Sequence, residues 1–251
     1  MADETKAGPP EEALPHVDVS ERAGHHTGKP QVLETRLFMQ LLVFDCALER
    51  DPVQALDRIE SELAARRVGA VLYEDVNAPR GIGVLTWTED PAHFVTRVRP
   101  ALTAAGEGLA LRPDHAMLGR TYATGYEPDL RFWLLERPVT TACNAQWPWA
   151  VWYPLRRSGA FNRLEGREQA AILKEHGAIG RAYGAQDLVH DIRLACFGLD
   201  VHDNDFVIGL CGKELQPLSH VVQAMRKTRQ TAEFMAQMGP FFVGHVARRL
   251  P

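Results

Sequence analysis

The sequence predicts an α+β fold made of two tandem βαββαβ units. Apolar runs of strand length alternate with amphipathic segments of helix length in the order β-α-β-β-α-β, and the second half of the chain repeats this order. The clearest internal repeat sets GVLTWTEDPAHFVTRVRPAL beside VIGLCGKELQPLSHVVQAMR, since each reads as strand, polar turn, proline and helix. Units of this order are ferredoxin-like, and their sheets pack face to face or close into an α+β barrel with the helices outside.

Composition narrows the class of protein. The chain has 251 residues, of which 45% are hydrophobic and 24% charged, with a formal net charge of −4. This balance argues against nucleic-acid binding, and without any run of about 18 apolar residues no membrane span is expected. The first residues lack the basic and apolar regions of a secretory signal, and the four cysteines form no CxxC pair. We therefore expect a cytoplasmic protein with reduced thiols.

Residues 1–33 are predicted to be a disordered N-terminal tail, because they are rich in Pro, Gly and Glu and almost free of aliphatic side chains. The N-terminal ferredoxin-like unit, residues 34–140, begins with the apolar strand 36–45. The helix 51–67 starts at the N-cap and N1 pair Asp51-Pro52, and its apolar residues recur at helical spacing. Strands 69–76 and 82–87 then flank the turn NAPRG, and a helix over 89–105, kinked or ended by Pro100, precedes a strand over 115–126.

The C-terminal ferredoxin-like unit, residues 141–251, repeats the pattern. We expect strands at 149–155, 191–199, 206–212 and 240–247, and helices at 165–183 and 218–238.

One histidine of this unit is aimed inward. Ile172, His176, Ile179 and Tyr183 recur at spacings of four, three and four, so they share one apolar helical face. His176 is compatible with a core histidine bonded to a carbonyl, and also with a metal or haem-iron ligand, since a haem site uses a neutral imidazole in an apolar cavity. Gly177 and the glycine three residues later would let a planar ligand approach the helix.

Two neighbouring segments offer further candidates. On the strand 191–199, alternation places Asp191 and Arg193 on one face, which is either a polar surface or the wall of a pocket. The segment 147–159 concentrates three tryptophans, a tyrosine and two arginines, a composition that suits either an aromatic core strand or the wall of a pocket for a flat cofactor. In the second case an arginine such as Arg157 would pair with the carboxylates of that cofactor.

These stretches together resemble a known family. YPLRRSG, EQAAILKEHGAIGRAYG, DIRLACFGLDVHDNDFVIGL, VVQAMRKTRQ and MGPFFVG are similar to the chlorite dismutase family, which includes the coproheme decarboxylases. The resemblance covers roughly residues 33 to 247 and is densest from Trp147 onward. It implies two ferredoxin-like units that form a dimeric α+β barrel, with an iron porphyrin, haem b or coproheme, bound to the C-terminal unit.

The resemblance also implies roles for individual residues. His176, within EHG, matches the proximal ligand of the iron, and Trp152 and Ile179 would line the cofactor. Tyr153 matches the redox-active tyrosine of coproheme decarboxylases, and Arg157 the basic residue after it. Chlorite dismutases typically lack this tyrosine and use a distal arginine, for which we prefer Arg193 over its neighbour Asp191.

One position departs from the family pattern. Family members often place a glutamate where MRKTRQT stands, and that glutamate accepts a hydrogen bond from the proximal imidazole; here Arg229 or Gln230 is expected near it. The resemblance implies a haem-dependent oxidoreductase that uses hydrogen peroxide to decarboxylate coproheme to haem b. The alternatives are a chlorite dismutase, which converts chlorite to chloride and dioxygen, and a haem-binding carrier or sensor without catalysis. A homo-oligomer is expected.

Overall fold

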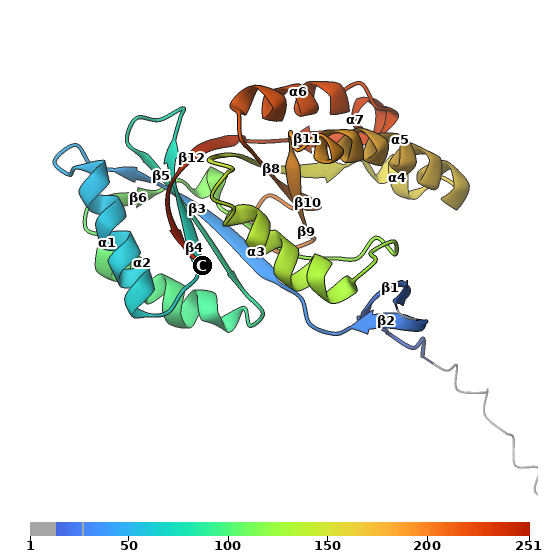
Figure 1. Ribbon diagram of the computed structural model, residues 1–251, viewed down its shortest axis with the longest axis horizontal. Coiled ribbons are helices and arrows are strands. Elements are labelled where there is room, and N and C mark those ends of the chain that lie inside the picture. The colour runs from blue at the N-terminus through green and yellow to red at the C-terminus, as the bar shows by residue number, and fades with distance from the viewer. Residues whose placement is uncertain (1–13, 27) are drawn as a thin grey trace, which may run out of the picture.

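The computed structural model describes residues 14–26 and 28–251 and has the predicted α+β architecture (Figure 1). The strands are β1 (Glu21–His26), β2 (Lys29–Leu33), β3 (Phe38–Cys46), β4 (Ala70–Asp75), β5 (Gly81–Thr88), β6 (Leu109–Leu111), β7 (Met117–Arg120), β8 (Trp149–Arg157), β9 (His190–Ala195), β10 (Phe206–Gly212), β11 (Met235–Met238) and β12 (Phe242–Leu250). The helices are α1 (Pro52–Ala65), α2 (Arg99–Ala105), α3 (Arg137–Ala142), α4 (Gly159–Asn162), α5 (Gly166–Ala185), α6 (Leu215–Met225) and α7 (Arg229–Phe234), and wider helical turns lead into α2 (Phe94–Val98) and α3 (Phe132–Glu136).

Antiparallel pairing joins the strands of both halves into one closed sheet. Its order is β10-β9-β7-β3-β5-β4-β12-β8, and β8 pairs again with β10, which closes the barrel. Strand β12 connects the two halves, because it pairs with β4 along one edge and with β8 along the other. β12 pairs with residues 149–152 of β8, and the short strand β11 pairs with residues 155–157 along the same edge. The predicted α+β barrel is therefore confirmed.

Side chains that alternate along each strand fill the barrel or face the outer helices. The inward side chains include Met39, Tyr73, Leu85, Trp152 and Phe242, all essentially inaccessible to solvent. Burying a large apolar side chain of this kind contributes roughly 1.5–3 kcal/mol. The interior of the barrel is therefore a packed core and not a binding site.

Helices cover the outer faces of the barrel. Helix α1 lays Leu56, Ile59 and Leu63 on the outside of the first-half strands, as its spacing predicts. The Asp51 carboxylate accepts a hydrogen bond from the Val53 amide at 3.0 Å and caps the helix. Helices α5, α6 and α7 lie over β8, β10 and β9 in the second half (Figure 1). In the described part of the chain, no helix is long and apolar enough to cross a membrane.

Three predicted elements end earlier than expected. The strand predicted over 191–199 stops at Ala195. The strand predicted over 115–126 stops at Arg120, because the Glu127 carboxylate accepts hydrogen bonds from the Thr124 and Gly125 amides at 2.8 and 2.9 Å and folds that segment into a turn. The helix predicted over 218–238 stops at Met225. After a break at the extended residue Thr228, α7 and the strand β11 follow.

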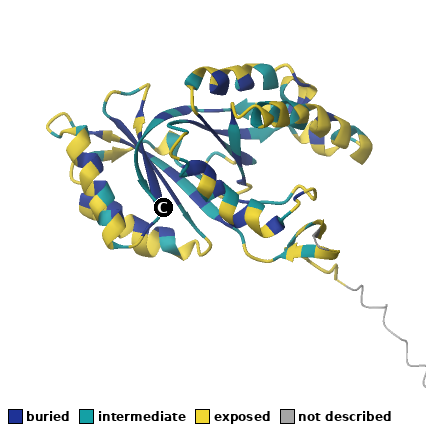
Figure 2. Ribbon diagram, in the orientation of Figure 1, coloured by how far each residue is buried: buried dark blue, intermediate teal, exposed yellow. Residues whose placement is uncertain are grey.

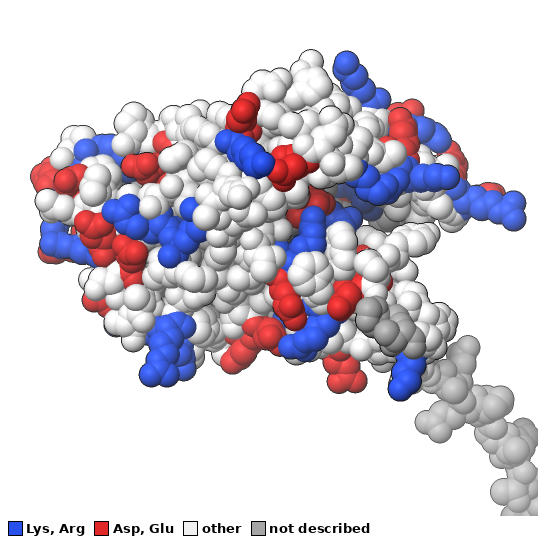
Figure 3. All heavy atoms as spheres, viewed as in Figure 1, with Lys and Arg blue, Asp and Glu red and all other residues white. Residues whose placement is uncertain are grey.

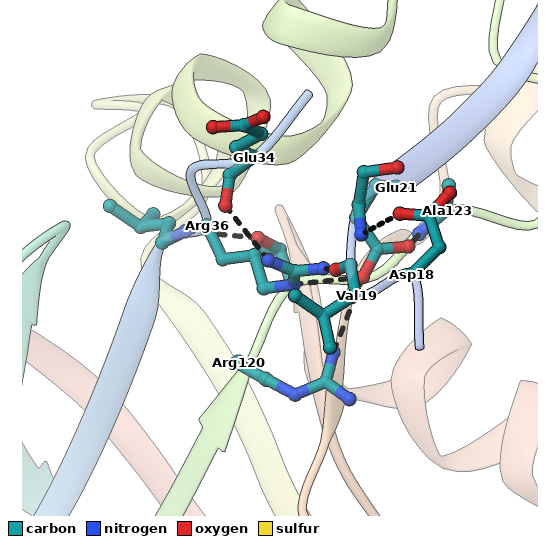
Figure 4. A network of polar contacts seen from close by, with 10 residues as sticks. Asp18, Val19, Glu21, Glu34, Arg36, Arg120 and Ala123 are labelled. Carbon is teal, nitrogen blue, oxygen red and sulfur yellow. Dashed lines mark hydrogen bonds and ion pairs between the residues drawn. The ribbon is translucent and has the colours of Figure 1, made fainter. Parts of the chain in front are cut away.

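The tail predicted over residues 1–33 is also corrected, since β1 and β2 form an antiparallel hairpin; residues 1–13 lie outside the described residues. Polar contacts hold the hairpin (Figure 4), in addition to Ala23 and Leu33, which pack against the core of the barrel. The Glu21 carboxylate, 14% exposed, accepts hydrogen bonds from Arg36 at 2.9 Å, from Arg120 at 3.3 Å and from the Ala123 amide at 2.9 Å. The amide of Gln31 bonds both to the Glu127 carbonyl and to the Leu130 amide. Composition alone does not reveal such long-range pairs.

Candidate functional site

The candidate site lies on the outer face of the second-half strands. Tyr153 on β8, Ile208 on β10 and Arg193 on β9 occupy one row across three adjacent strands, so their side chains share a face. In the next row toward the C-terminal end of β8, Leu155 lies opposite Phe206. The structure therefore brings the two residues predicted to be catalytic to one surface.

Tyr153 is held by apolar packing. Its side chain is 6% exposed, and its ring stacks on Phe241 with centroids 4.6 Å apart. Burial raises the pKa of its hydroxyl above the ordinary value, the charge of Asp191 adds to this effect, and Arg226 opposes it. The hydroxyl makes no hydrogen bond to any described residue. Tyr153 is thus a protonated phenol whose hydroxyl is available to a bound group.

Helix α5 covers this face only loosely. Among its twenty residues only Ile172 is buried, so the helix is mostly exposed or half-buried (Figure 2). A Cβ added at Gly177 would meet only the side chain of Arg181, and one added at Gly180 only the Met225 methyl, at 3.5 Å. Ile179 lies on the inner side of the helix, in the apolar cluster that contains Tyr153. The helix therefore leaves a partly unfilled face toward the sheet.

His176 stands on this helix as a half-buried neutral imidazole. Burial lowers its pKa below the ordinary value, and the positive charges of Arg157 and Arg193 lower it further, whereas Glu175 opposes them. The Nδ1 atom lies 3.1 Å from Oγ1 of Thr228.

The hydrogen-bond partner of His176 differs from the expectation, which named Arg229 or Gln230. Arg229 instead pairs with Glu168 and Glu233, and the buried Gln230 makes no contact with the ring. Thr228 takes this position because the chain breaks between α6 and α7, and the break places Thr228 next to the imidazole.

The guanidinium of Arg157 has no anionic partner among the described residues. Its Nε atom is buried and has no hydrogen-bond partner, and no carboxylate forms an ion pair with its guanidinium within residues 14–26 and 28–251. The guanidinium lies over the rings of Phe161 and Phe206, at 4.6 and 4.7 Å from their centroids. Burial lowers its pKa. An unpaired, half-buried guanidinium of this kind is a ready partner for a ligand carboxylate.

Arg193 and Asp191, between which the sequence leaves the distal position open, form one ion pair. Arg193 Nε lies 3.0 Å from Asp191, whose carboxylate also accepts a hydrogen bond from Arg137 of α3 at 2.9 Å. Two guanidinium groups thus share one carboxylate. Beside them is a small hollow of about 20 Å³, lined in part by Tyr122 and Trp133.

A second hollow lies where α6, α7 and β11 meet. It has a volume of about 320 Å³ and is lined by Arg226, Thr231, Met235, Gln237 and neighbouring residues. The side chain of Arg226 makes no ion pair to any described residue. Sequence analysis missed Arg226 and Thr231, because the predicted helix ran on through them. Figure 3 shows the molecule hollowed on the side of α5, with Lys and Arg atoms along the hollow.

Trp152 does not join this site. Its side chain is 0% exposed inside the barrel, where it packs over Gly209 and belongs to the same core as Tyr73 and Phe242. Adjacent residues of a strand point to opposite faces, so Trp152 and Tyr153 cannot both face α5. The composition of the segment predicts an aromatic wall but does not say which rings form it.

These residues fit an iron porphyrin. The neutral imidazole of His176 would supply a nitrogen ligand to the iron, and the unpaired guanidinium of Arg157 would supply a partner for a carboxylate. The lack of side chains at Gly177 and Gly180 would let a planar ring approach the helix. No group of three or more metal-binding side chains is present in the described part of the chain, so a metal held by protein ligands alone has no candidate site there.

A family model described as chlorite dismutase matches residues 85–247. The chain belongs to the chlorite dismutase family. A comparison with curated proteins found no match.

Solved structures of this family have the same fold. A novel heme-binding protein from Thermus thermophilus is 19% identical with a TM-score of 0.65, and the match covers 84% of this chain and 91% of that one. A putative chlorite dismutase, TA0507, is 11% identical with a TM-score of 0.69 and coverages of 85% and 96%. A mutant chlorite dismutase from Candidatus Nitrospira defluvii is 14% identical with a TM-score of 0.65 and coverages of 86% and 93%. At these identities the likeness establishes the fold alone.

Proposed function

We propose that this chain binds an iron porphyrin between α5 and the outer face of β8, β10 and β9, with His176 as the axial ligand. The observation that carries the proposal is the neutral, half-buried imidazole of His176, which is bonded at Nδ1 by Thr228 and therefore has Nε2 free for a metal. The fold relationship to a heme-binding protein supports the same choice.

The cations of the site favour a porphyrin with several carboxylates. Arg157 and Arg226 have no ion-pair partner among the described residues and lie at different places around the face below α5. Thr231 adds a hydroxyl beside Arg226. Coproheme carries four propionates and haem b two, so two unpaired guanidinium groups can pair with carboxylates of either porphyrin. What favours coproheme as the substrate is Tyr153, which matches the redox-active tyrosine of coproheme decarboxylases.

The reaction that we propose is the peroxide-dependent decarboxylation of coproheme to haem b. A bound iron porphyrin supplies the centre at which hydrogen peroxide is reduced. In the overall balance, one propionate carboxylate, one hydrogen peroxide and one proton give one vinyl group, one carbon dioxide and two waters. The propionate thereby loses two electrons, which the peroxide gains.

Tyr153 is the residue of this chain suited to relay the oxidation. Its hydroxyl gives up an electron and a proton and then regains a hydrogen atom from the propionate side chain. The raised pKa keeps the phenol protonated at neutral pH, as this role requires. Arg157 and Arg226 would hold the carboxylates in place, and Arg193 would present a polar group to the peroxide.

The test is a titration of the purified protein with ferric coproheme, followed by hydrogen peroxide and mass spectrometry of the porphyrin. We expect a saturable Soret shift that His176→Ala loses. After peroxide we expect two successive losses of carbon dioxide and two hydrogens, one for each propionate converted, and Tyr153→Phe should abolish both. Tyr73→Phe is the matched control, because Tyr73 is a buried tyrosine inside the barrel. Equal decarboxylation by Tyr153→Phe and wild type would refute the assigned role.

A chlorite dismutase is the second candidate, since Arg193 shares a row with Tyr153 on the face below α5. Dioxygen release from chlorite that Arg193→Ala loses and Tyr153→Phe keeps would favour it. A third candidate is a haem-binding protein without catalysis, and the neutral partner of His176 favours it. In that case the porphyrin binds, and neither peroxide nor chlorite is consumed.

A further inference from the structure

We infer that Thr228 is a positioning residue that fixes the tautomer of His176. Its hydroxyl accepts a hydrogen bond from Nδ1–H of the imidazole, which leaves Nε2 with its lone pair as the ligand atom. The part of this inference that concerns a bound porphyrin rests on the proposed function.

Local structure places the hydroxyl of Thr228 in this position. Thr228 is 1% exposed and stands in the break between α6 and α7, with extended backbone angles. A threonine at the N-cap usually bonds to an amide of the helix that it starts, but the side chain of Thr228 caps no amide of α7. Instead its Oγ1 contacts the Met225 carbonyl at 2.7 Å and His176 Nδ1 at 3.1 Å. The hydroxyl is thus diverted from helix capping to the imidazole.

Counting protons decides the direction of the hydrogen bond. A carbonyl oxygen only accepts, and that of Met225 is the nearest acceptor of the Thr228 hydroxyl proton, at 2.7 Å. One lone pair of this carbonyl takes the Thr228 amide at 3.0 Å and the other takes the hydroxyl proton. Toward His176 the hydroxyl then offers a lone pair, and the ring must carry its proton on Nδ1. The Oγ1 of Thr231 is farther away, at 3.4 Å, and can donate to the second lone pair of Thr228.

No carboxylate takes the place of this neutral acceptor among the described residues. Glu175 lies next to His176 in sequence, but its Oε2 faces the amide of Arg229 at 3.3 Å. Glu168 and Glu233 both pair with the side chain of Arg229. On the sheet side the imidazole faces the positive charges of Arg157 and Arg193. The ring therefore has the orientation of a metal ligand without the added basicity that a carboxylate partner gives.

The first experiment uses the cofactor-free protein. Nitrogen-15 NMR of the His176 ring, assigned with His176→Gln, reports which nitrogen is protonated. We expect the Nδ1–H tautomer in wild type, and in Thr228→Val a shift of the tautomer ratio by about fivefold toward Nε2–H, which is the equivalent of the roughly 1 kcal/mol of a neutral hydrogen bond. Thr228→Ser should restore the wild-type ratio. Thr86→Val, the matched control, should not change it, because Thr86 is an equally buried threonine on β5.

An Nε2–H tautomer in wild type, or an unchanged ratio in Thr228→Val, would overturn the inference. Because valine has nearly the shape of threonine, circular dichroism should show the same fold for both proteins. Failure of Thr228→Ser to restore the ratio would also count against the role of the hydroxyl.

The second experiment uses ferric haem b as the probe. We expect Thr228→Val to bind it about tenfold more weakly than wild type, as for other partners of a metal-bound histidine. Thr228→Asp should lower the reduction potential of the bound iron, because a carboxylate makes the imidazole a stronger donor. An unchanged potential in Thr228→Asp would contradict the argument about basicity. If wild type bound neither ferric haem b nor ferric coproheme, the proposed function would be refuted, while the NMR result would still decide the tautomer.

Discussion

Replacing Gly209 by alanine should destabilise the barrel through Trp152. A Cβ at this position would lie 2.5, 2.6 and 2.7 Å from Cη2, Cζ3 and Cζ2 of the indole. Carbon atoms pack at about 3.5–4.0 Å, so the overlap is roughly 1 Å. The indole is fully buried and opposite Gly209 in register, so it cannot move away without displacing the core.

Overpacking of a dense core costs roughly 1–3 kcal/mol. For a chain of this length about 2 kcal/mol corresponds to a decrease of roughly 4–8 °C in Tm, which differential scanning calorimetry measures. Gly166→Ala is the control, because a Cβ there has nothing within 4 Å. We expect its stability to stay within about 0.5 kcal/mol of wild type.

Trp152→Phe completes the test. It removes the part of the indole that the new methyl group would strike, so the double variant should be about 1–2 kcal/mol more stable than the sum of the single effects. Trp152→Phe should also lower the Tm and leave the affinity for ferric coproheme unchanged. Equal Tm values for Gly209→Ala and Gly166→Ala would refute the packing argument. Weaker porphyrin binding by Trp152→Phe at unchanged Tm would instead place the indole in the cofactor site.

Three further predictions concern polar groups. Burial raises the pKa of Asp191, but the two guanidinium groups beside it outweigh burial and lower the pKa overall. The contribution of Asp191 to stability should therefore be present at neutral pH and lost as the pH falls through the lowered pKa. The Tm difference between wild type and Asp191→Asn should vanish on acidification, and a constant difference would contradict this. Glu21→Gln should release the N-terminal hairpin and speed hydrogen exchange of the Ala123 amide by about tenfold, the equivalent of roughly 1.4 kcal/mol for a charged hydrogen bond. An unchanged exchange rate would show that other contacts hold the hairpin. Arg157→Met should keep or raise the Tm, since it removes a half-buried charge without an ion pair, and should weaken coproheme binding; a large loss of Tm would make Arg157 a structural residue.

The periodicity of the sequence predicts most of the strands and helices of the barrel, but it predicts the orientation of only some of the site residues. Helical spacing puts His176 on the inner face of α5, and strand alternation puts Asp191 and Arg193 on one face of β9, because both patterns follow from backbone geometry. Tyr153 comes from the family resemblance. The same alternation would exclude Trp152, had the inward face of β8 been known. That face is decided by pairing with β10 and β12, which no local pattern reveals.

The other differences between the predicted and the observed fold are caused by individual polar side chains. Met225 is followed by six polar residues, 226–231, before apolar residues resume at Ala232. A polar stretch of this length also occurs on the exposed side of a continuous helix, so it does not mark Thr228 as the point where the helix breaks. The N-terminal hairpin depends on Glu21, whose partners are distant in sequence. Side-chain hydrogen bonds of this kind override composition locally.

The position of β12 in the barrel has a consequence for biosynthesis. Residues 242–250 leave the ribosome after both strands that they join, β4 and β8. Until then each of these two strands has an open edge, and open edges are where nascent chains pair wrongly or aggregate. The surface beneath α5 includes β8, so the site is completed only after translation has passed residue 250. A ribosome stalled before β12 would hold a chain that has every proposed catalytic residue and an unclosed barrel.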